Sequence, residues 1–128
     1  MISPTGQGVR IDSKGSGEFL SMRGIRLHRG TDFLCTPGQP VVAPIKGTIH
    51  RVVYPYEDDL GYSGIDLYRK HMLIRMFYLF PNLDLIGQEV EERDIIGVAQ
   101  DISKRYDSDM QPHIHVEVYF DPGYFAGI

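Results

Sequence analysis

One cysteine, Cys35, is present among 128 residues. A single cysteine cannot form an internal disulfide, so the fold does not depend on an oxidising compartment. No run reaches the roughly 18 consecutive apolar residues of a membrane span. The N-terminus lacks the basic and apolar segments of a signal peptide. We therefore expect a product made in the cytoplasm, without a signal peptide and without a membrane span.

The chain also lacks a cluster of basic residues. It has 17 acidic and 13 basic side chains, for a net charge of −4, and no run of Lys and Arg is longer than two residues, as at Arg69-Lys70. Non-specific binding to nucleic-acid phosphates needs a basic patch or stripe. We expect no nucleic-acid partner.

The length and the turn-forming residues limit the fold class. A chain of 128 residues is long enough for one core and too short for two. Its 14 glycines and 8 prolines predict many turns and disfavour a bundle of long helices. No internal repeat or linker divides it. We predict one domain over residues 1–128, in which 1–26 are an irregular Gly- and Ser-rich lead-in with at most a short strand.

From Gly30 onward, apolar segments recur every eight to twelve residues, which is typical of an antiparallel sheet protein. Strands are predicted at 33–35, 39–44, 48–53, 64–68, 72–78 and 113–120, with two turn-and-short-strand units within 84–97. Residues 54–62 form an acidic loop, and 69–71 a hairpin turn. Pro81 predicts that the residues following it form a loop rather than a central strand. Residues 101–111 form either a single helical turn or a loop. The fold class is mainly β.

The last predicted strand carries the clearest chemical signal. Its side chains alternate between two faces, so that His113, His115 and Glu117 share one face and Ile114, Val116 and Val118 the other. One face packs and the other presents two imidazoles. Paired histidines on a solvated strand face need no ligand. An H-x-H pattern by itself therefore more often marks an ordinary solvent-exposed strand face than a metal site.

A second group of candidate ligands lies upstream. His28 and Asp32 are four residues apart in a segment with a glycine that allows it to bend. A catalytic zinc site uses three nitrogen or oxygen ligands and leaves one position open. Any three of His28, Asp32, His113 and His115 would complete such a site. The spare imidazole could then act as a general base, because histidine titrates near neutral pH.

Several motifs occur together in an order that resembles the lysostaphin/LytM-type zinc metallopeptidases. They are Gly6-Gln7-Gly8-Val9-Arg10, His28-x-x-x-Asp32, the run Thr36 to Gly47, Gly87-x-x-Val90, Ile96-Gly97, and Pro112 to Val118. The resemblance covers about residues 6 to 120. It implies a compact antiparallel β-sheet, barrel or sandwich domain with a metal-containing groove.

The resemblance also implies roles for individual residues. Zinc is bound by His28, Asp32 and His115, and His113 is a catalytic histidine. The activity implied is hydrolysis of peptide bonds in the stem peptides or cross-bridges of bacterial peptidoglycan.

One position departs from the family pattern. The family has Tyr-x-His-Leu about nine residues before the glycine of its G-x-x-V turn, and here that histidine is replaced by Tyr78. The same Met-Phe-Tyr run occurs in the leukocyte cell-derived chemotaxin variant of the family. That variant resembles the enzymes and retains the zinc, but it is a signalling protein. A phenol still donates a hydrogen bond, so Tyr78 could stabilise an oxyanion as imidazole would.

Two functions therefore remain open. The first is a zinc metalloendopeptidase acting on peptidoglycan, with His113 and Tyr78 as catalytic residues; a compact chain of this kind would suit a bacteriophage or prophage product, virion-associated or released on lysis. The alternative is a zinc-binding, non-catalytic binding or structural module of the same fold, which Tyr78 favours.

Other reactive residues have simpler interpretations. Cys35 follows the Asp32 segment on an apolar strand and is predicted to be a buried, inert thiol. His50 and His71 are most simply surface histidines. Glu117 could accept a hydrogen bond from a ligand imidazole, although a solvated carboxylate is equally consistent with its position.

Overall fold

The structure is a computed structural model of residues 1–128. It describes residues 1–9, 30–106 and 109–120, and four two-residue strands within 10–29. His28 therefore lies outside the described residues. No helix in the described part of the chain is long and apolar enough to cross a membrane.

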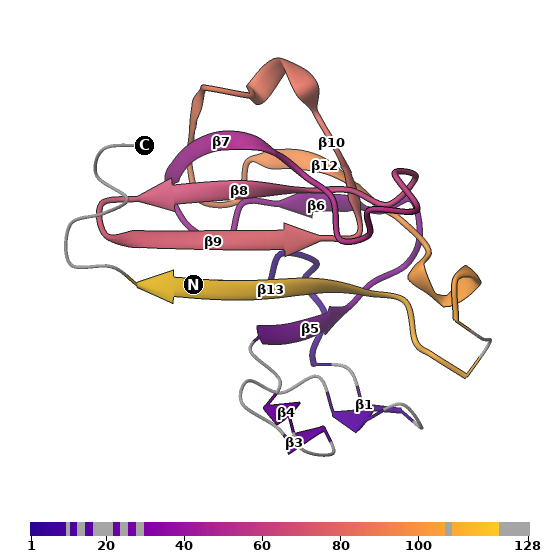
Figure 1. Ribbon diagram of the computed structural model, residues 1–128. Helices are drawn as coiled ribbons and strands as arrows, with labels where there is room; N and C mark the ends of the chain where they lie inside the picture. Colours follow the sequence, from indigo (N-terminus) through magenta and orange to yellow (C-terminus); the bar gives the residue numbers. More distant parts are fainter. Residues whose placement is uncertain are drawn as a thin grey trace.

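The larger of two main sheets has six antiparallel strands (Figure 1). Its order is β11 (Glu89–Val90), β7 (Gly47–Val53), β8 (Gly64–Arg69), β9 (Met72–Phe77), β13 (His113–Phe120) and β5 (Gly30–Leu34). Strands β8 and β9 form the predicted hairpin, and β13 has the predicted bounds. The mainly β, antiparallel prediction is confirmed.

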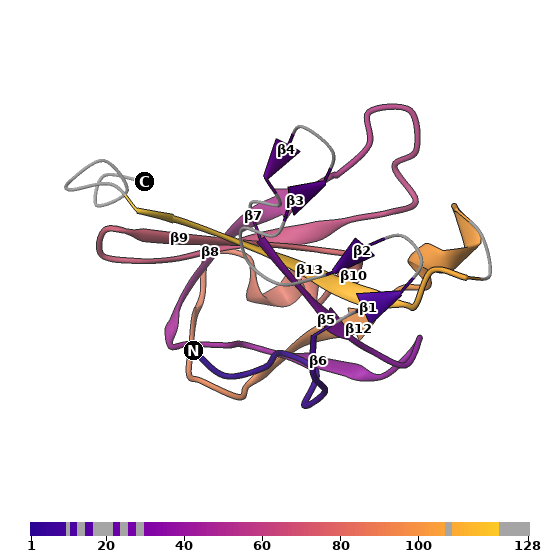
Figure 2. The same ribbon diagram turned by 90° about the horizontal axis from the view of Figure 1, so that it is seen from below.

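The smaller sheet has three strands, β10 (Leu79–Pro81), β12 (Ile95–Ala99) and β6 (Pro40–Val42). Two short 3₁₀ helices, η1 (Leu83–Leu85) and η2 (Ile102–Lys104), connect strands. The helix η2 is the single helical turn that was one of the two alternatives for the 101–111 segment. Figure 2 shows the N-terminal residues beside β6, where Val42 N–H donates to the Pro4 carbonyl at 2.9 Å.

The lead-in contains more strand than the sequence predicted. Four two-residue strands pair as β1 (Ile11–Asp12) with β2 (Gly15–Ser16), and β3 (Met22–Arg23) with β4 (Arg26–Leu27). Such short strands have no detectable alternation of apolar residues. That residues 1–128 form one domain remains a prediction.

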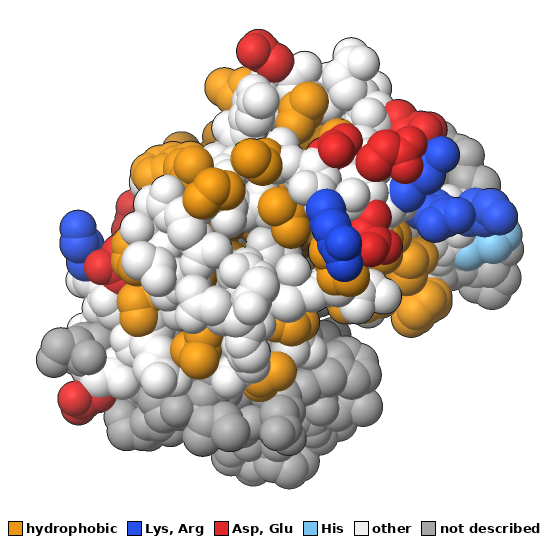
Figure 3. Space-filling view, turned by 180° about the vertical axis from the view of Figure 1, so that it is seen from behind, with side chains coloured by type: hydrophobic (Ala, Val, Ile, Leu, Met, Phe, Trp, Pro, Cys, Tyr) orange, Lys and Arg blue, Asp and Glu red, His pale blue; other side chains and the backbone are white. Residues whose placement is uncertain are grey.

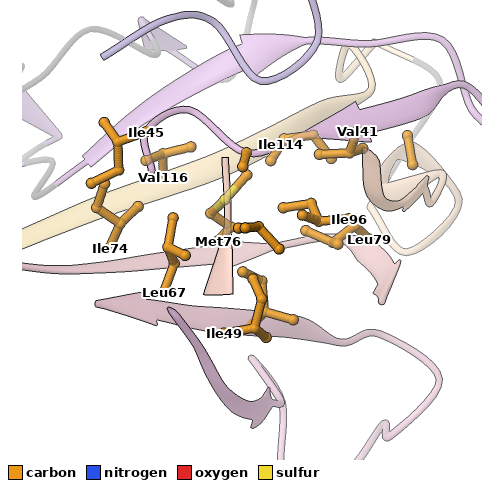
Figure 4. Packing of buried hydrophobic residues seen from close by; sticks show 14 of the residues in the cluster. Val41, Ile45, Ile49, Leu67, Ile74, Met76, Leu79, Ile96, Ile114 and Val116 are labelled. Atoms are coloured by element: carbon orange, nitrogen blue, oxygen red, sulfur yellow. The ribbon is translucent and has the colours of Figure 1, made fainter. Parts of the chain in front are cut away.

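One apolar core lies between the two main sheets (Figure 4). The larger sheet contributes Ile49, Ile65, Leu67, Ile74, Met76, Ile114 and Val116, and the smaller sheet contributes Val41, Leu79 and Ile96. These residues alternate along each long strand, so every second side chain of β8, β9 and β13 points the other way. The outer face of the larger sheet is thereby left for polar side chains.

Pro81 is the last residue of strand β10. It pairs with Gly97 at the end of β10, which is an edge strand of the smaller sheet. Proline lacks the N–H that a central strand would need, and an edge position does not require it. The residues after Pro81 form no strand until β11, as predicted.

Acidic and basic side chains are interspersed on the face seen in Figure 3. Among the exposed ion pairs, Lys46 lies 3.5 Å from Glu89 and 3.6 Å from Glu91. Such exposed pairs contribute little to stability.

We predict that Gly64→Ala destabilises the protein by at least about 2 kcal/mol. An added Cβ at Gly64 would lie 1.8 Å from the Met76 carbonyl oxygen, whereas at Gly8 it would meet no atom within 4 Å. Urea unfolding of both alanine variants tests this. Gly8→Ala should change the free energy of unfolding by less than about 0.5 kcal/mol; equal losses in both variants would contradict the packing argument.

Candidate active site

The strand register places the predicted site residues side by side. On the outer face of β13, His115 lies directly opposite Asp32 of β5 and opposite Phe77 of β9. His113 lies opposite Leu34, one step nearer the end of the sheet. The alternation predicted for this strand is confirmed, because Ile114 and Val116 are buried in the core on the opposite face.

Asp32 is the centre of the group. Its side chain is 2% exposed, and its Oδ1 lies 2.5 Å from His115 Nδ1. Its Oδ2 lies 3.6 Å from His113 Nε2. A buried carboxylate is costly unless charged or hydrogen-bonding groups compensate it, and here two imidazoles face it.

His115 is held between two carboxylates. Its Nε2 lies 3.1 Å from Glu117 Oε2, and Tyr119 O–H donates to the other Glu117 oxygen at 2.7 Å. Burial alone would lower the pKa of His115, but the hydrogen bonds to Asp32 and Glu117 outweigh it and raise the pKa to about 9. Glu117 therefore contacts the imidazole of His115, a predicted zinc ligand. This agrees with the first of the two predicted roles, in which Glu117 accepts a hydrogen bond from a ligand imidazole.

His113 has a defined tautomer. Its Nδ1 lies 2.7 Å from the Gln111 carbonyl oxygen, which can only accept a hydrogen bond, so this nitrogen carries the proton. In the neutral ring Nε2 is then the basic nitrogen, and it is the atom that faces Asp32. The side chain is buried and its ring meets the Tyr78 ring edge-on at 5.4 Å.

Tyr78 adopts a backbone conformation that is rare for a residue with a side chain. Its φ is +76°, in the left-handed region, between the end of β9 and the start of β10. Such a conformation costs about 1–3 kcal/mol and persists only where the surroundings impose it. The Tyr78 N–H donates to the Ser63 carbonyl at 2.8 Å, and its carbonyl accepts from Gln100 N–H at 2.9 Å.

A buried polar network fixes this turn. The Gln100 side chain accepts from Ser63 N–H at 3.0 Å through its Oε1 and donates to the Gly61 carbonyl at 2.6 Å through its Nε2. The Ser63 hydroxyl donates to the Leu79 carbonyl at 2.9 Å. The network ties the 54–62 loop to both ends of the Tyr78 turn.

The candidate site residues line one pocket of about 350 Å³. It is lined by Asp32, Pro55, Tyr56, Phe77, Tyr78, Tyr106, Met110, His113, His115 and Glu117. The structure therefore brings together Asp32, Tyr78, His113 and His115. Sequence reasoning did not assign Phe77 or Met110 to the site, because neither position differs from ordinary apolar packing.

The donor atoms of the site are of the kinds that zinc binds. Asp32 and His115 supply an oxygen and a nitrogen that face each other, and both are ordinary zinc ligands. Within the described residues, no group of three or more His, Cys, Asp and Glu side chains is arranged to hold a metal ion. The described chain thus contributes two of the three predicted ligands; the third is His28.

The remaining candidates behave as inert residues. Cys35 is buried, and burial raises the pKa of its thiol to about 12, so it is not a reactive thiolate at neutral pH. His71 is exposed in the hairpin turn, as predicted. His50 is half-buried, with its ring edge-on to Tyr68 at 5.8 Å, and is therefore a packing residue more than a surface one.

Several curated proteins are similar to this chain in sequence. Leukocyte cell-derived chemotaxin-2 of Bos taurus is 31% identical over 107 residues, which cover 83% of this chain and 69% of that protein. The Mus musculus protein is 32% identical with the same coverage. An uncharacterized metalloprotease of Haemophilus influenzae is 30% identical over 97 residues, 76% of this chain but 19% of its own length. No protein-family model matches the chain.

Solved structures share the fold. The solution structure of lysostaphin has a TM-score of 0.65 at 24% identity; the match covers 86% of this chain and 44% of that one. The catalytic domain of the antimicrobial peptidase lysostaphin from Staphylococcus simulans scores 0.60 at 22% identity, covering 85% and 80%. A catalytic domain of the prophage-encoded protein EnpA from Enterococcus faecalis scores 0.58 at 20% identity, covering 90% and 82%.

Together the sheets and the comparisons define a β domain with the fold of the lysostaphin catalytic domain. The chain belongs to the family of leukocyte cell-derived chemotaxin-2, and it has the fold of the lysostaphin catalytic domain.

We predict that Gln100→Ala lowers the free energy of unfolding by about 1–3 kcal/mol, because it leaves the buried Ser63 N–H without its partner and removes the hydrogen bond to the Gly61 carbonyl. Thermal or urea unfolding measures this. Gln88→Ala, at an exposed position, is the matched control and should be near neutral. Identical stabilities of the two variants would show that the network does not hold the Tyr78 turn.

Proposed function

We propose that this protein is a zinc-dependent endopeptidase that hydrolyses peptide bonds in the stem peptides or cross-bridges of bacterial peptidoglycan. The observation that carries the proposal is the convergence of Asp32, His113 and His115 in one pocket of the family fold. Relatives named as a metalloprotease and as an antimicrobial peptidase support the same class of reaction. A bacteriophage or prophage origin and release on lysis or with a virion stay predictions.

The proposed zinc ligands are His28, Asp32 and His115. When bound, zinc supplies a Lewis acid that polarises a peptide carbonyl. Glu117 keeps the His115 ring in one orientation by its contact at Nε2, which leaves Nδ1 directed at the Asp32 carboxylate.

His113 is proposed as the general base. Because its Nδ1 donates to the Gln111 carbonyl, its Nε2 carries no proton in the neutral ring and can take one from an attacking water molecule. The same nitrogen can later return the proton to the leaving amine. Its near-complete burial fixes the ring at the wall of the pocket.

Tyr78 is proposed as the donor to the developing oxyanion. Burial raises the pKa of its phenol to about 12, so it keeps its proton at neutral pH and can donate a hydrogen bond. The imposed backbone turn aims the side chain at the pocket that His113 and His115 also line. A donor fixed before the reaction stabilises the oxyanion without reorganisation.

A second candidate function is a zinc-binding module without turnover. The observation that favours it is tyrosine at position 78, together with 31–32% identity to chemotaxin-2, whose name describes a signalling protein rather than a peptidase. The two candidates share the metal and differ in catalysis.

We predict that the protein binds about one zinc ion per chain and that His115→Ala removes it. His113→Ala should keep the metal, because His113 is not one of the proposed ligands, and should lose activity by about 10²–10⁴-fold. Metal analysis of the three proteins after dialysis decides the assignment. Equal zinc loss in the two variants would mean that the histidine roles are wrong.

We predict that Tyr78→Phe lowers turnover on purified peptidoglycan by about 10²–10³-fold, the cost of losing one oxyanion donor. Zinc content should not change. Tyr78→His, which restores the family residue, should retain or raise activity because imidazole can donate from the same turn.

The outcome separates the two candidate functions. If the zinc-loaded wild type and Tyr78→His both leave every peptidoglycan preparation intact, the binding module becomes the better account. If Tyr78→Phe is as active as wild type, the tyrosine is a packing residue and its proposed role is wrong.

A further inference from the structure

A row of alternating charges crosses the outer face of the larger sheet. Four strands that lie side by side in Figure 1 contribute one residue each: Arg51 on β7, Asp66 on β8, Arg75 on β9 and Glu117 on β13. In the strand register, Asp66 lies directly opposite both arginines. Arg75 in turn lies directly opposite Glu117. The row therefore ends at the carboxylate that contacts the imidazole of His115.

Asp66 holds the Arg75 guanidinium in one orientation. Arg75 Nε donates to Asp66 Oδ1 at 2.8 Å, and Arg75 Nη2 donates to Asp66 Oδ2 at 3.0 Å. Two parallel hydrogen bonds of this kind fix the plane of a guanidinium as well as its position. Arg51 Nε also donates to Asp66 Oδ2, at 3.0 Å. The positive charge of Arg75 therefore has a fixed place between β8 and β13.

Stability alone does not account for this ion pair. The side chain of Asp66 is only 1% exposed, and that of Arg75 is 26% exposed. Removing such charges from water costs free energy that their attraction only roughly offsets, and a well-packed apolar pair often stabilises a fold as well or better. What the ion pair adds is a charge at a defined point, next to Glu117.

Glu117 is the neighbour on which this fixed charge acts. Its Oε1 accepts from the Tyr119 hydroxyl at 2.7 Å, and its Oε2 lies 3.1 Å from His115 Nε2. Opposite charges that face each other across an antiparallel pair attract, as Arg75 and Glu117 do here. The Arg75 Cζ also lies 5.9 Å from the centroid of the Tyr119 ring. Arg75 thus faces both the carboxylate and the ring of the residue that donates to it.

We propose that Arg75, held by Asp66, is a positioning residue that keeps the Glu117 carboxylate against the His115 imidazole. The proposal rests on the role of zinc ligand proposed for His115. A carboxylate at the second nitrogen of a ligand imidazole fixes the orientation of the ring, and its loss typically weakens metal binding by about 10–100-fold. Arg75 acts one step further out, through Glu117.

Arg75→Gln tests the proposal, because it removes the charge and keeps a polar side chain. Arg51→Gln is the matched control: Arg51 also pairs with Asp66, but it lies on the side of Asp66 away from Glu117. A role limited to compensating the buried Asp66 carboxylate would make the two variants alike. Far-UV circular dichroism checks that both fold. Should Arg75→Gln not fold, the double variant Asp66→Asn/Arg75→Gln, which removes both charges of the pair, replaces it with the same expectations.

The first readout needs no metal. In crystal structures of the metal-free protein, we expect wild type and Arg51→Gln to retain the contact between Glu117 Oε2 and His115 Nε2. In Arg75→Gln we expect these two atoms to lie more than about 3.5 Å apart, beyond hydrogen-bond distance. A contact that survives in Arg75→Gln, or that Arg51→Gln breaks as well, would overturn the proposal.

The second readout is the dissociation constant of zinc, measured by competition with a fluorescent chelator. Arg75→Gln should weaken zinc binding by about 10-fold, and Arg51→Gln should change it by less than about twofold. In a Glu117→Ala background, Arg75→Gln should have no further effect, because Arg75 acts through Glu117. Equal affinities of Arg75→Gln and wild type, or an additive loss in the double variant, would overturn the positioning role.

These readouts separate this proposal from the proposed function. A wild type that binds zinc but leaves peptidoglycan intact, and whose zinc affinity falls in Arg75→Gln, supports the positioning role and contradicts the enzyme. A wild type that hydrolyses peptidoglycan, and whose zinc affinity Arg75→Gln leaves unchanged, supports the enzyme and overturns the positioning role. If the wild type binds no zinc, the proposed function fails, and the metal-free crystal structures decide the effect of Arg75 on Glu117.

Discussion

The pairing of Asp32 with His115 across β5 and β13 is the constraint on which the site depends. A carboxylate this buried needs partners, and strand register supplies them by placing an imidazole directly opposite. Slipping the register by one residue would turn both histidines into the core and expose Ile114 and Val116. The packing of the core and the geometry of the site are therefore fixed by the same alternation.

A second constraint acts at Tyr78, where the chain leaves the larger sheet for the smaller one. The left-handed turn interrupts the alternation of β9 and aims one aromatic side chain at the pocket. Its strain is offset by the buried contacts of Ser63 and Gln100. The Tyr56 hydroxyl then contacts the phenol from the pocket side. Backbone and side chain of Tyr78 are thus held by different segments.

Sequence patterns predicted the parts that depend on local periodicity and turn chemistry. The 113–120 strand, the 64–78 hairpin and the placement of His113 and His115 on the face opposite the core residues follow from alternation, and the structure confirms them, except that the second hairpin strand ends at Phe77. The Gln100 network and the contacts among the hydroxyls of Tyr56, Tyr78 and Tyr106 join distant segments, and no local sequence pattern indicates them. Edge pairing at Pro81 was missed because edge and central strands look alike in sequence. The metal and catalytic roles of His28, Asp32, Tyr78, His113 and His115 stay predictions.

The central claim is that this pocket hydrolyses peptide bonds with the help of a metal. The most direct measurement is the release of new amino groups from purified peptidoglycan by the full chain loaded with zinc, by the same protein after chelator treatment, and after zinc is restored. The account predicts release that the chelator abolishes and zinc recovers. Release that persists in metal-free protein, or none from zinc-loaded protein on peptidoglycans with different cross-bridges, would contradict it.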